Sequence, residues 1–272
     1  METGTLLPDQ HDPSAHSHRE RDLLVALRQL GGSARASDLA GALDVSEKTV
    51  RRAIKTLSKS GHVVRIRGGA YLADGRASQT FLRRIAQHSD EKHVIAATVA
   101  SGLHDGMSLF LDVGTTTAVI AEELRDLSNL TIVTNSIGVA QALGNHNGNR
   151  LHLLGGEMQR DERGVFGHVT ETQLRQFSVD LAILSADALS TNGFLYRDVA
   201  EAQLGSIVAD CASKVLVAMT HFKFNETAAF RGPDPSDVHM LVVDKAPDGA
   251  LAAALKGWRV EVHLATGKRE QC

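Results

Sequence analysis

The sequence has few residues that form disulfides or metal sites, and it has no long apolar run. Its 272 residues include two cysteines, Cys211 and Cys272, which form neither a CxxC pair nor a zinc-binding set. No apolar run approaches the roughly 18 residues that a membrane helix needs. The first 18 residues are polar and lack the apolar stretch of a signal peptide. We therefore expect a cytoplasmic protein without a disulfide framework.

Aromatic residues are also scarce, at 4% of the chain, although apolar residues make up 43%. The apolar residues are mostly Ala, Val, Leu and Ile, a composition that suits helices packed on a buried parallel sheet. The chain is long enough for one small and one larger domain. Neither a Walker A pattern nor GxGxxG occurs, so the sequence does not support a familiar nucleotide site and we expect no cofactor.

Acidic residues are missing from one basic stretch. Seven basic residues and no acidic residue lie between Lys48 and Arg67. The wider segment 19–76 carries 12 Lys and Arg against 6 Asp and Glu, whereas the rest of the chain carries 17 against 26. This asymmetry predicts an anionic partner for the N-terminal part only.

We divide the chain into four parts by its composition and apolar patterning. Residues 1–18 are expected to be a disordered tail, 19–74 a winged helix-turn-helix, 75–90 a linker and 91–272 a mostly parallel α/β domain. The tail histidines His11, His16 and His18 can bind metal in principle. Their irregular spacing, without a completing Cys or carboxylate set, favours a solvated tail and no metal site.

The segment 19–74 reads as three short helices and a hairpin. Ser37 and Ser46 are predicted N-caps of the second and third helices. Val50, Ile54 and Leu57 recur at helical spacing and form the buried face of the third helix.

The opposite face of the third helix carries the basic residues. Lysine and arginine on such a face can neutralise DNA phosphates, and arginine can bind guanine edges in the major groove. Two other interpretations stay open, a solvated cationic face and a protein-docking module. The predicted DNA-binding residues are Ser46, Lys48, Thr49, Arg51, Arg52, Lys55, Arg65 and Arg67.

From residue 91 onward short apolar strands alternate with helices. A loop-rich stretch is expected after the strand at 150–154, and the last strand is expected at 258–264. Ligands of such folds bind at the carboxyl ends of the strands. Three strand ends are rich in glycine or hydroxyl groups: 112–117, 134–136 and 154–156. Free N–H groups at a helix start hold phosphate oxygens, and threonine hydroxyls add donors. Each turn alone can be a capped helix, but the three together predict an anion-binding pocket.

Two carboxylates and a lysine follow later strands. Asp187, Glu201 and Lys223 can bind sugar hydroxyls and phosphate, or can perform acid–base chemistry. The predicted effector-binding residues are Asp112, Gly114, Thr115, Thr116, Thr117, Asn135, Ser136, Gly155, Gly156, Asp187, Glu201 and Lys223.

Several motifs together resemble the DeoR family of bacterial repressors from about Arg19 to Lys245. These motifs are Asp44-Val45-Ser46-Glu47-Lys48-Thr49-Val50-Arg51-Arg52, Arg67-Gly68-Gly69-Ala70, Asp112-Val113-Gly114-Thr115-Thr116-Thr117, Val133-Thr134-Asn135-Ser136 and Leu153-Leu154-Gly155-Gly156.

The resemblance implies a winged helix joined to an effector domain related to ribose-phosphate isomerases and CoA transferases. It further implies an oligomeric repressor of a carbohydrate or polyol operon that binds double-stranded operator DNA. A phosphorylated sugar or related metabolite would release it from that DNA.

The chain departs from the family pattern at three places. Ala53 replaces an aspartate after Arg51-Arg52, Ser185-Ala186-Asp187-Ala188 replaces Gly-Ala-Asp-Gly, and Leu195-Tyr196 replaces Thr-Thr. Compared with the family pattern, the residues expected to bind the phosphate are retained. The residues expected to recognise the rest of the effector are altered.

Two other functions are compatible with parts of this sequence. One is an isomerase-like enzyme using Asp187, Glu201 or Lys223, and the other is a DNA-binding protein whose pocket has lost its ligand. A basic winged helix has no role in sugar isomerisation, so we expect no catalytic residues. The retained Thr115–Thr117 turn argues against the loss of the ligand.

Overall fold

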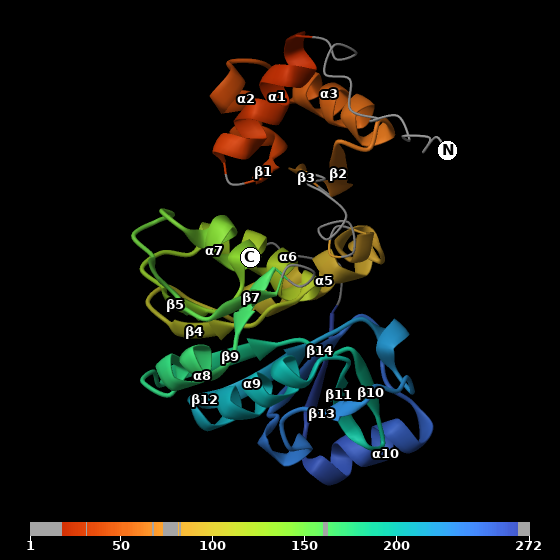
Figure 1. Ribbon diagram of the computed structural model, residues 1–272. Coiled ribbons are helices and arrows are strands. Elements are labelled where there is room, and N and C mark those ends of the chain that lie inside the picture. Colours follow the sequence, from red (N-terminus) through yellow and green to blue (C-terminus); the bar gives the residue numbers. More distant parts are fainter. Residues whose placement is uncertain are drawn as a thin grey trace, which may run out of the picture. The chain divides into compact units, whose positions relative to one another are not determined.

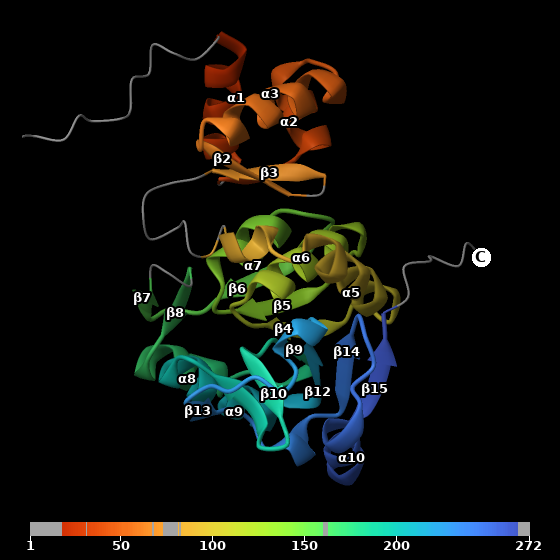
Figure 2. The same ribbon diagram turned by 90° about the vertical axis from the view of Figure 1, so that its right-hand side faces the viewer.

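The computed structural model describes residues 18–30, 32–66, 68–72, 81, 83–159 and 163–265. The chain divides into two compact units, Met1–Leu72 and Ala73–Cys272. Figures 1 and 2 show each unit in two views. The expected disordered tail, apart from His18, lies outside the described residues. His18 begins the first helix and contacts Asp22, with 3.0 Å between Nδ1 and Oδ2.

The first unit is a winged helix-turn-helix, as the sequence predicts. Its three strands form an antiparallel sheet in the order β1-β3-β2. The pattern of the sequence indicated only the two-stranded hairpin and missed β1. The elements are α1 (His18–Gln29), β1 (Ser33–Arg35), α2 (Ala36–Leu43), α3 (Glu47–Lys59), β2 (Val63–Ile66) and β3 (Gly69–Leu72).

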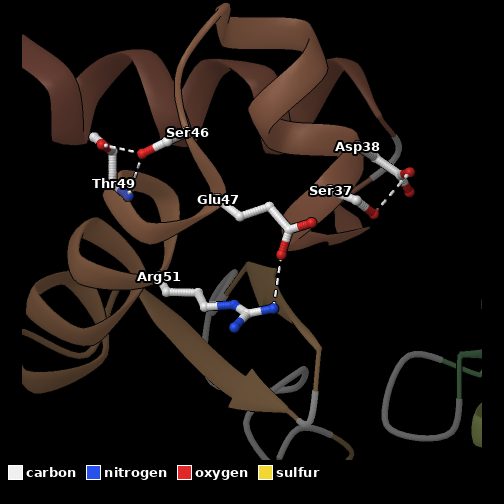
Figure 3. Close-up of polar contacts among 6 residues, drawn as sticks. All are labelled: Ser37, Asp38, Ser46, Glu47, Thr49 and Arg51. Atoms are coloured by element: carbon white, nitrogen blue, oxygen red, sulfur yellow. Dashed lines mark hydrogen bonds and ion pairs between the residues drawn. The ribbon is translucent and has the colours of Figure 1, made fainter.

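One of the two predicted N-caps is present. Ser46 caps α3, because its Oγ accepts a hydrogen bond from the Thr49 amide at 3.3 Å (Figure 3). Ser37 does not cap α2, and its hydroxyl instead donates to Asp38 Oδ1 at 3.5 Å. The helix begins at Ala36, whose amide donates to the carbonyl of Gly68 in the wing turn. The expected serine cap is therefore wrong, because β1 runs directly into α2.

The second unit is built on a seven-stranded sheet in the order β15-β14-β12-β9-β4-β5-β6, and all its neighbouring strands are parallel. This confirms the predicted α/β class. Its strands are β4 (Ser108–Leu111), β5 (Thr131–Thr134), β6 (Arg150–Leu153), β9 (Val179–Leu184), β12 (Ala212–Ala218), β14 (Met240–Val243) and β15 (Glu261–Leu264).

Helices cover both faces of this sheet, as Figures 1 and 2 show. One face carries α5 (Ser89–Ser101), α6 (Thr115–Glu123) and α7 (Ile137–Leu143), and the other carries α8 (His168–Leu174), α9 (Val199–Asp210) and α10 (Gly249–Trp258). From β4 the chain proceeds outward to β5 and β6, whereas from β9 it proceeds the other way to β12. The carboxyl ends of β4 and β9 therefore form the switch point at which ligands of open α/β sheets bind.

Three details of the second unit differ from expectation. The stretch after β6, expected to be loop-rich, contains α8 and the antiparallel pair β7 (Glu157–Gln159) and β8 (Gly164–Phe166). A small sheet of β10 (Ala188–Ser190), β11 (Gly193–Tyr196) and β13 (Phe230–Arg231) was not predicted. The strand expected at 258–264 begins only at Glu261, because Trp258 ends α10.

Each unit has its own apolar core. In the first unit Leu27, Leu39 and Leu57 join the three helices. In the second, Phe110, Ala182 and Val217 come from adjacent strands and pack beneath the helices. Among the described helices, none has the length and apolar character needed to cross a bilayer.

Candidate DNA-binding face and effector pocket

Helix α3 separates apolar and basic residues onto opposite faces. Val50, Ile54 and Leu57 are buried against the other helices. Burial of this apolar stripe fixes the rotation of the helix and turns its other side to solvent. The exposed basic side chains on that side are Lys48, Arg51, Arg52 and Lys55.

Arg51 is held by a neighbour on its own helix. Its Nη2 donates to Glu47 Oε2 at 2.7 Å, one turn earlier (Figure 3). The two side chains are 67% and 46% exposed. An ion pair this exposed contributes little to stability, so DNA can displace the glutamate. Arg65 is exposed on β2, and Arg67 lies outside the described residues.

The candidate effector pocket starts at the carboxyl ends of β4 and β9. Asp112 follows β4, and its Oδ2 accepts a hydrogen bond at 2.7 Å from the amide of Ser185, which follows β9. Asn135 follows β5, and Lys223 follows β12. Four strand ends thus contribute polar groups to one edge of the sheet.

A small cavity lies between these strand ends and α9, with room for a group about the size of one water molecule. Its lining is mostly apolar and includes the polar residues Asp112, Asn135, Tyr196 and Glu201. Within the described residues no hydrogen-bond partner reaches Asp112 Oδ1, Asn135 Oδ1 or the Tyr196 hydroxyl, although all three atoms are shielded from solvent. Burial raises the pKa of Asp112 to about 8 against the opposing hydrogen bond from Ser185. Buried polar atoms without partners are unusual and mark this cavity as a candidate binding site.

The three threonines of the Gly114 turn do not share one role. Thr117 donates its hydroxyl to the carbonyls of Asp112 and Gly114, at 3.1 and 2.9 Å, so this hydrogen is already used within the turn. Thr116 Oγ1 is buried, with no partner in the described structure. Thr115 is half-buried at the start of α6.

Lys223 lies among the predicted carboxylates. Its Nζ donates to the carbonyl of Ala186. The negative charges of Asp187, Asp112 and Glu201 favour its protonated form. Burial lowers the pKa of Lys223, and the carboxylates, chiefly Asp187, oppose that shift. The structure therefore brings together the acidic residues and the lysine that the sequence singled out.

Comparisons with known proteins agree with this geometry. A model of the DeoR-like helix-turn-helix domain matches residues 19–76, and a model of the DeoR C-terminal sensor domain matches residues 87–245. The chain belongs to the DeoR family. It is therefore a DNA-binding transcriptional repressor rather than an enzyme.

Two curated relatives of this DeoR-family repressor come from Escherichia coli (strain K12). The chain is 31% identical to the HTH-type transcriptional repressor CsqR, over 91% of this chain and 94% of the relative. It is 28% identical to the glycerol-3-phosphate regulon repressor, over 89% and 96%. A solved ribose 5-phosphate isomerase from Methanocaldococcus jannaschii matches with a TM-score of 0.38 and 18% identity, covering 51% of this chain and 55% of that one.

Some residues predicted to line the effector pocket have structural roles in the second unit. Ser136 Oγ accepts from the Val139 amide and caps α7. The Gly155 amide donates to Gln173 Oε1 at 2.7 Å, and its carbonyl accepts from Thr170. A Cβ at Gly156 would lie 2.2 Å from Thr170 Oγ1. These two glycines pack against α8 and are not among the residues lining the cavity.

The sequence interpretation missed Lys92 of α5. This lysine is only 4% exposed and donates to the carbonyls of Arg84 and Gln87. Burial, with Lys223 and Arg84 nearby, lowers its pKa to about 7. The signal was present in the sequence, because Lys92 occupies the apolar face formed by Ile95, Ala96 and Val99.

In the sequence Tyr196 stands out only as a departure from the family pattern, yet it lines the cavity. No group of three or more potential metal ligands occurs among the residues that the structure describes.

Proposed function

We propose that this repressor acts in the cytoplasm as a homo-oligomer on an operon for carbohydrate or polyol breakdown. The exposed basic face of α3, opposite its buried stripe, supports insertion of this helix into the major groove. One short recognition helix covers few base pairs, and repeated half-sites read by a symmetric oligomer are the common remedy. We assign the DNA contacts to Lys48, Arg51, Arg52 and Lys55 of α3, with Ser46 and Thr49 at its start and Arg65 and Arg67 on the wing.

A phosphorylated sugar-type metabolite is the proposed releasing effector. One observation carries this proposal: Lys223 lies near buried polar atoms that have no hydrogen-bond partner in the described structure, at the switch point of the sheet. Thr115 and Thr116, at the start of α6, are proposed to bind the phosphate together with Lys223. Asp187 and Glu201 are proposed to face the hydroxyl groups, because carboxylates accept hydrogen bonds and repel phosphate. The name of one relative, a glycerol-3-phosphate regulon repressor, agrees with this class of metabolite.

The DNA part of the proposal is tested with duplexes selected from a random library. Arg52→Ala should weaken specific binding by roughly 1–3 kcal/mol in fluorescence anisotropy, because a base-edge contact is lost. Lys256→Ala, at an exposed position in α10, is the charge-matched control and should bind as wild type does. Equal affinity of Arg52→Ala and wild type for the selected duplex would remove α3 from the reading role.

The effector part is tested by calorimetry and a reporter gene. An effector acts only through its different affinity for the DNA-bound and DNA-free states. Thr116→Ala and Lys223→Ala should therefore retain DNA binding but lose induction, and cells should remain repressed. Normal induction in both variants would show that the phosphate lies elsewhere. An isomerase function is not favoured, because the curated relatives are named transcriptional repressors.

A further inference from the structure

Tyr196 lies in a slot that the surrounding backbone leaves open for its ring. It is 3% exposed and belongs to β11, where it pairs with Phe230 of β13. A Cβ at Gly232 would lie 2.1 Å from Tyr196 Cε2, and one at Gly205 would lie 3.4 Å from the phenolic oxygen. The ring therefore occupies space that side chains at these two positions would fill. This packing holds the phenol at one place in the cavity wall.

Buried polar atoms near this phenol have no hydrogen-bond partner within the described structure. Asp112 Oδ1 and Asn135 Oδ1 have no hydrogen-bond partner in the described structure, and neither does the Tyr196 hydroxyl. All three residues line the same cavity, as does Glu201. Leaving such atoms unpaired in a buried place is costly, so a bound group that pairs with them gains affinity.

The chemistry of these atoms selects hydroxyl groups. The amide oxygen of Asn135 and the carboxylate of Glu201 accept hydrogen bonds, whereas phosphate oxygens are acceptors themselves. A carbon-bound hydroxyl can donate to one of these oxygens and accept from the phenol at the same time. Burial raises the pKa of Tyr196 well above its usual value, so the phenol keeps its proton and remains a donor.

We propose that Tyr196 determines which effector the repressor accepts, donating a hydrogen bond to a hydroxyl of the effector's carbon chain while its ring limits the length of that chain. The inference rests on the proposed function and names the recognition of that same site. It assigns the hydroxylated end of the effector to the wall formed by Asp112, Asn135, Tyr196 and Glu201, and the phosphate to the side of Lys223.

The experiment measures binding of four probes by isothermal titration to the full chain. The probes are inorganic phosphate, glycerol 3-phosphate, ribose 5-phosphate and glucose 6-phosphate. Tyr196→Phe keeps the ring in its slot and removes only the hydroxyl, so it should fold as wild type does. Of the three organic phosphates, we expect this variant to bind the one that wild type binds most tightly about fivefold more weakly, as for one lost hydrogen bond. Its binding of inorganic phosphate should be unchanged.

A second variant tests the length limit. Tyr196→Val retains a residue suited to a strand and opens the space of the ring. The ratio of its affinity for glucose 6-phosphate to that for glycerol 3-phosphate should rise above the wild-type ratio. Tyr71→Phe is the matched control, because the other tyrosine of the chain lies in the winged helix and its loss should leave all four affinities unchanged.

The outcomes separate this inference from the proposed function. If wild type binds a phosphorylated polyol and Tyr196→Phe binds it equally well, the inference is overturned and the proposed effector class stands. An unchanged length preference in Tyr196→Val overturns the limit set by the ring. If wild type binds none of the three phosphorylated sugars and polyols, both the proposed effector class and the inference are wrong.

Discussion

The guanidinium of Arg163 lies over the ring of Phe81, with 5.7 Å between Cζ and the ring centroid. Phe81 is buried and belongs to a short helical segment, residues 81 and 83–86, on the chain between the winged helix and α5. Arg163 immediately precedes β8, where Val165 exchanges two hydrogen bonds with Asn135 of the pocket. The strand β8 thus contacts the candidate pocket wall, and the residue directly before it contacts the connecting segment.

We expect Arg163→Ala to weaken the coupling between effector and DNA. The cation–π contact should contribute about twofold to tenfold to an equilibrium constant. The variant should bind effector normally, while the loss of DNA affinity on adding effector shrinks by a similar factor. Anisotropy titrations with and without effector measure this loss.

Arg175→Ala, which removes an exposed arginine after α8, is the control for Arg163→Ala. Coupling as strong in Arg163→Ala as in this control would show that the contact with Phe81 plays no part in release.

Glu47→Gln should strengthen DNA binding. The change frees Arg51 from its ion pair and removes a negative charge beside the phosphates. We expect roughly two- to fivefold tighter DNA binding than wild type at low salt. The difference in affinity should become smaller as added salt screens the charges. Glu226→Gln makes the same change of net charge at an exposed site in the other unit. Equal gains in the two variants would trace the effect to net charge rather than to Arg51.

Lys92 should make stability rise with pH. Its pKa falls to about 7 in the folded chain, so above this pH the unfolded chain, with a pKa near 10.5, binds more protons. Raising the pH from about 7 to about 9 therefore favours the folded state. Lys92→Met lacks this contribution. Between pH of about 7 and about 9, the free energy of unfolding of wild type should therefore rise relative to that of the variant.

Urea titrations followed by the fluorescence of Trp258, which lies in the second unit, measure the effect of Lys92. Lys256→Met replaces an exposed lysine and should follow the wild-type pH dependence. A constant difference between wild type and Lys92→Met would mean that Lys92 stays charged throughout.

Gly114→Ala should destabilise the second unit. The added Cβ would lie 2.3 Å from Ser185 Oγ and 3.0 Å from Thr117 Oγ1, and overpacking of this kind costs roughly 1–3 kcal/mol. Gly257→Ala is the control, because a Cβ there meets nothing within 4 Å. Circular dichroism during urea unfolding compares the two variants. Equal stability would show that the turn adjusts without cost.

The sequence predicts the main sheet because its strands are short apolar runs separated by helical stretches. It misses β1, β7, β8, β10, β11 and β13, which are two to four residues long and have no alternating pattern. Apolar periodicity cannot detect such strands, because pairing with distant segments defines them, as where Leu195 of β11 lies opposite Arg231 of β13.

The pocket was predicted in part for a similar reason. Asp112, Asn135 and Lys223 follow strands, and strand ends of a parallel sheet meet at one edge. Gly155 has the same sequence context, yet it binds Gln173, because α8 was not foreseen. Tyr196 belongs to the unforeseen small sheet, so its place in the cavity could not be inferred.

The seven-stranded sheet ends in two unlike strands, β6 and β15, each with an exposed leucine, Leu153 and Leu264. An edge strand offers N–H and C=O groups to another chain. If β6 meets β6 of a second copy, or β15 meets β15, the contact is two-fold and growth stops at a dimer. If β6 meets β15 of the next copy, every addition leaves a fresh edge, and the product is a fibre unless the rotation closes a ring. A finite oligomer built through these edges therefore requires that like edges pair, or that the rotation between copies closes a ring.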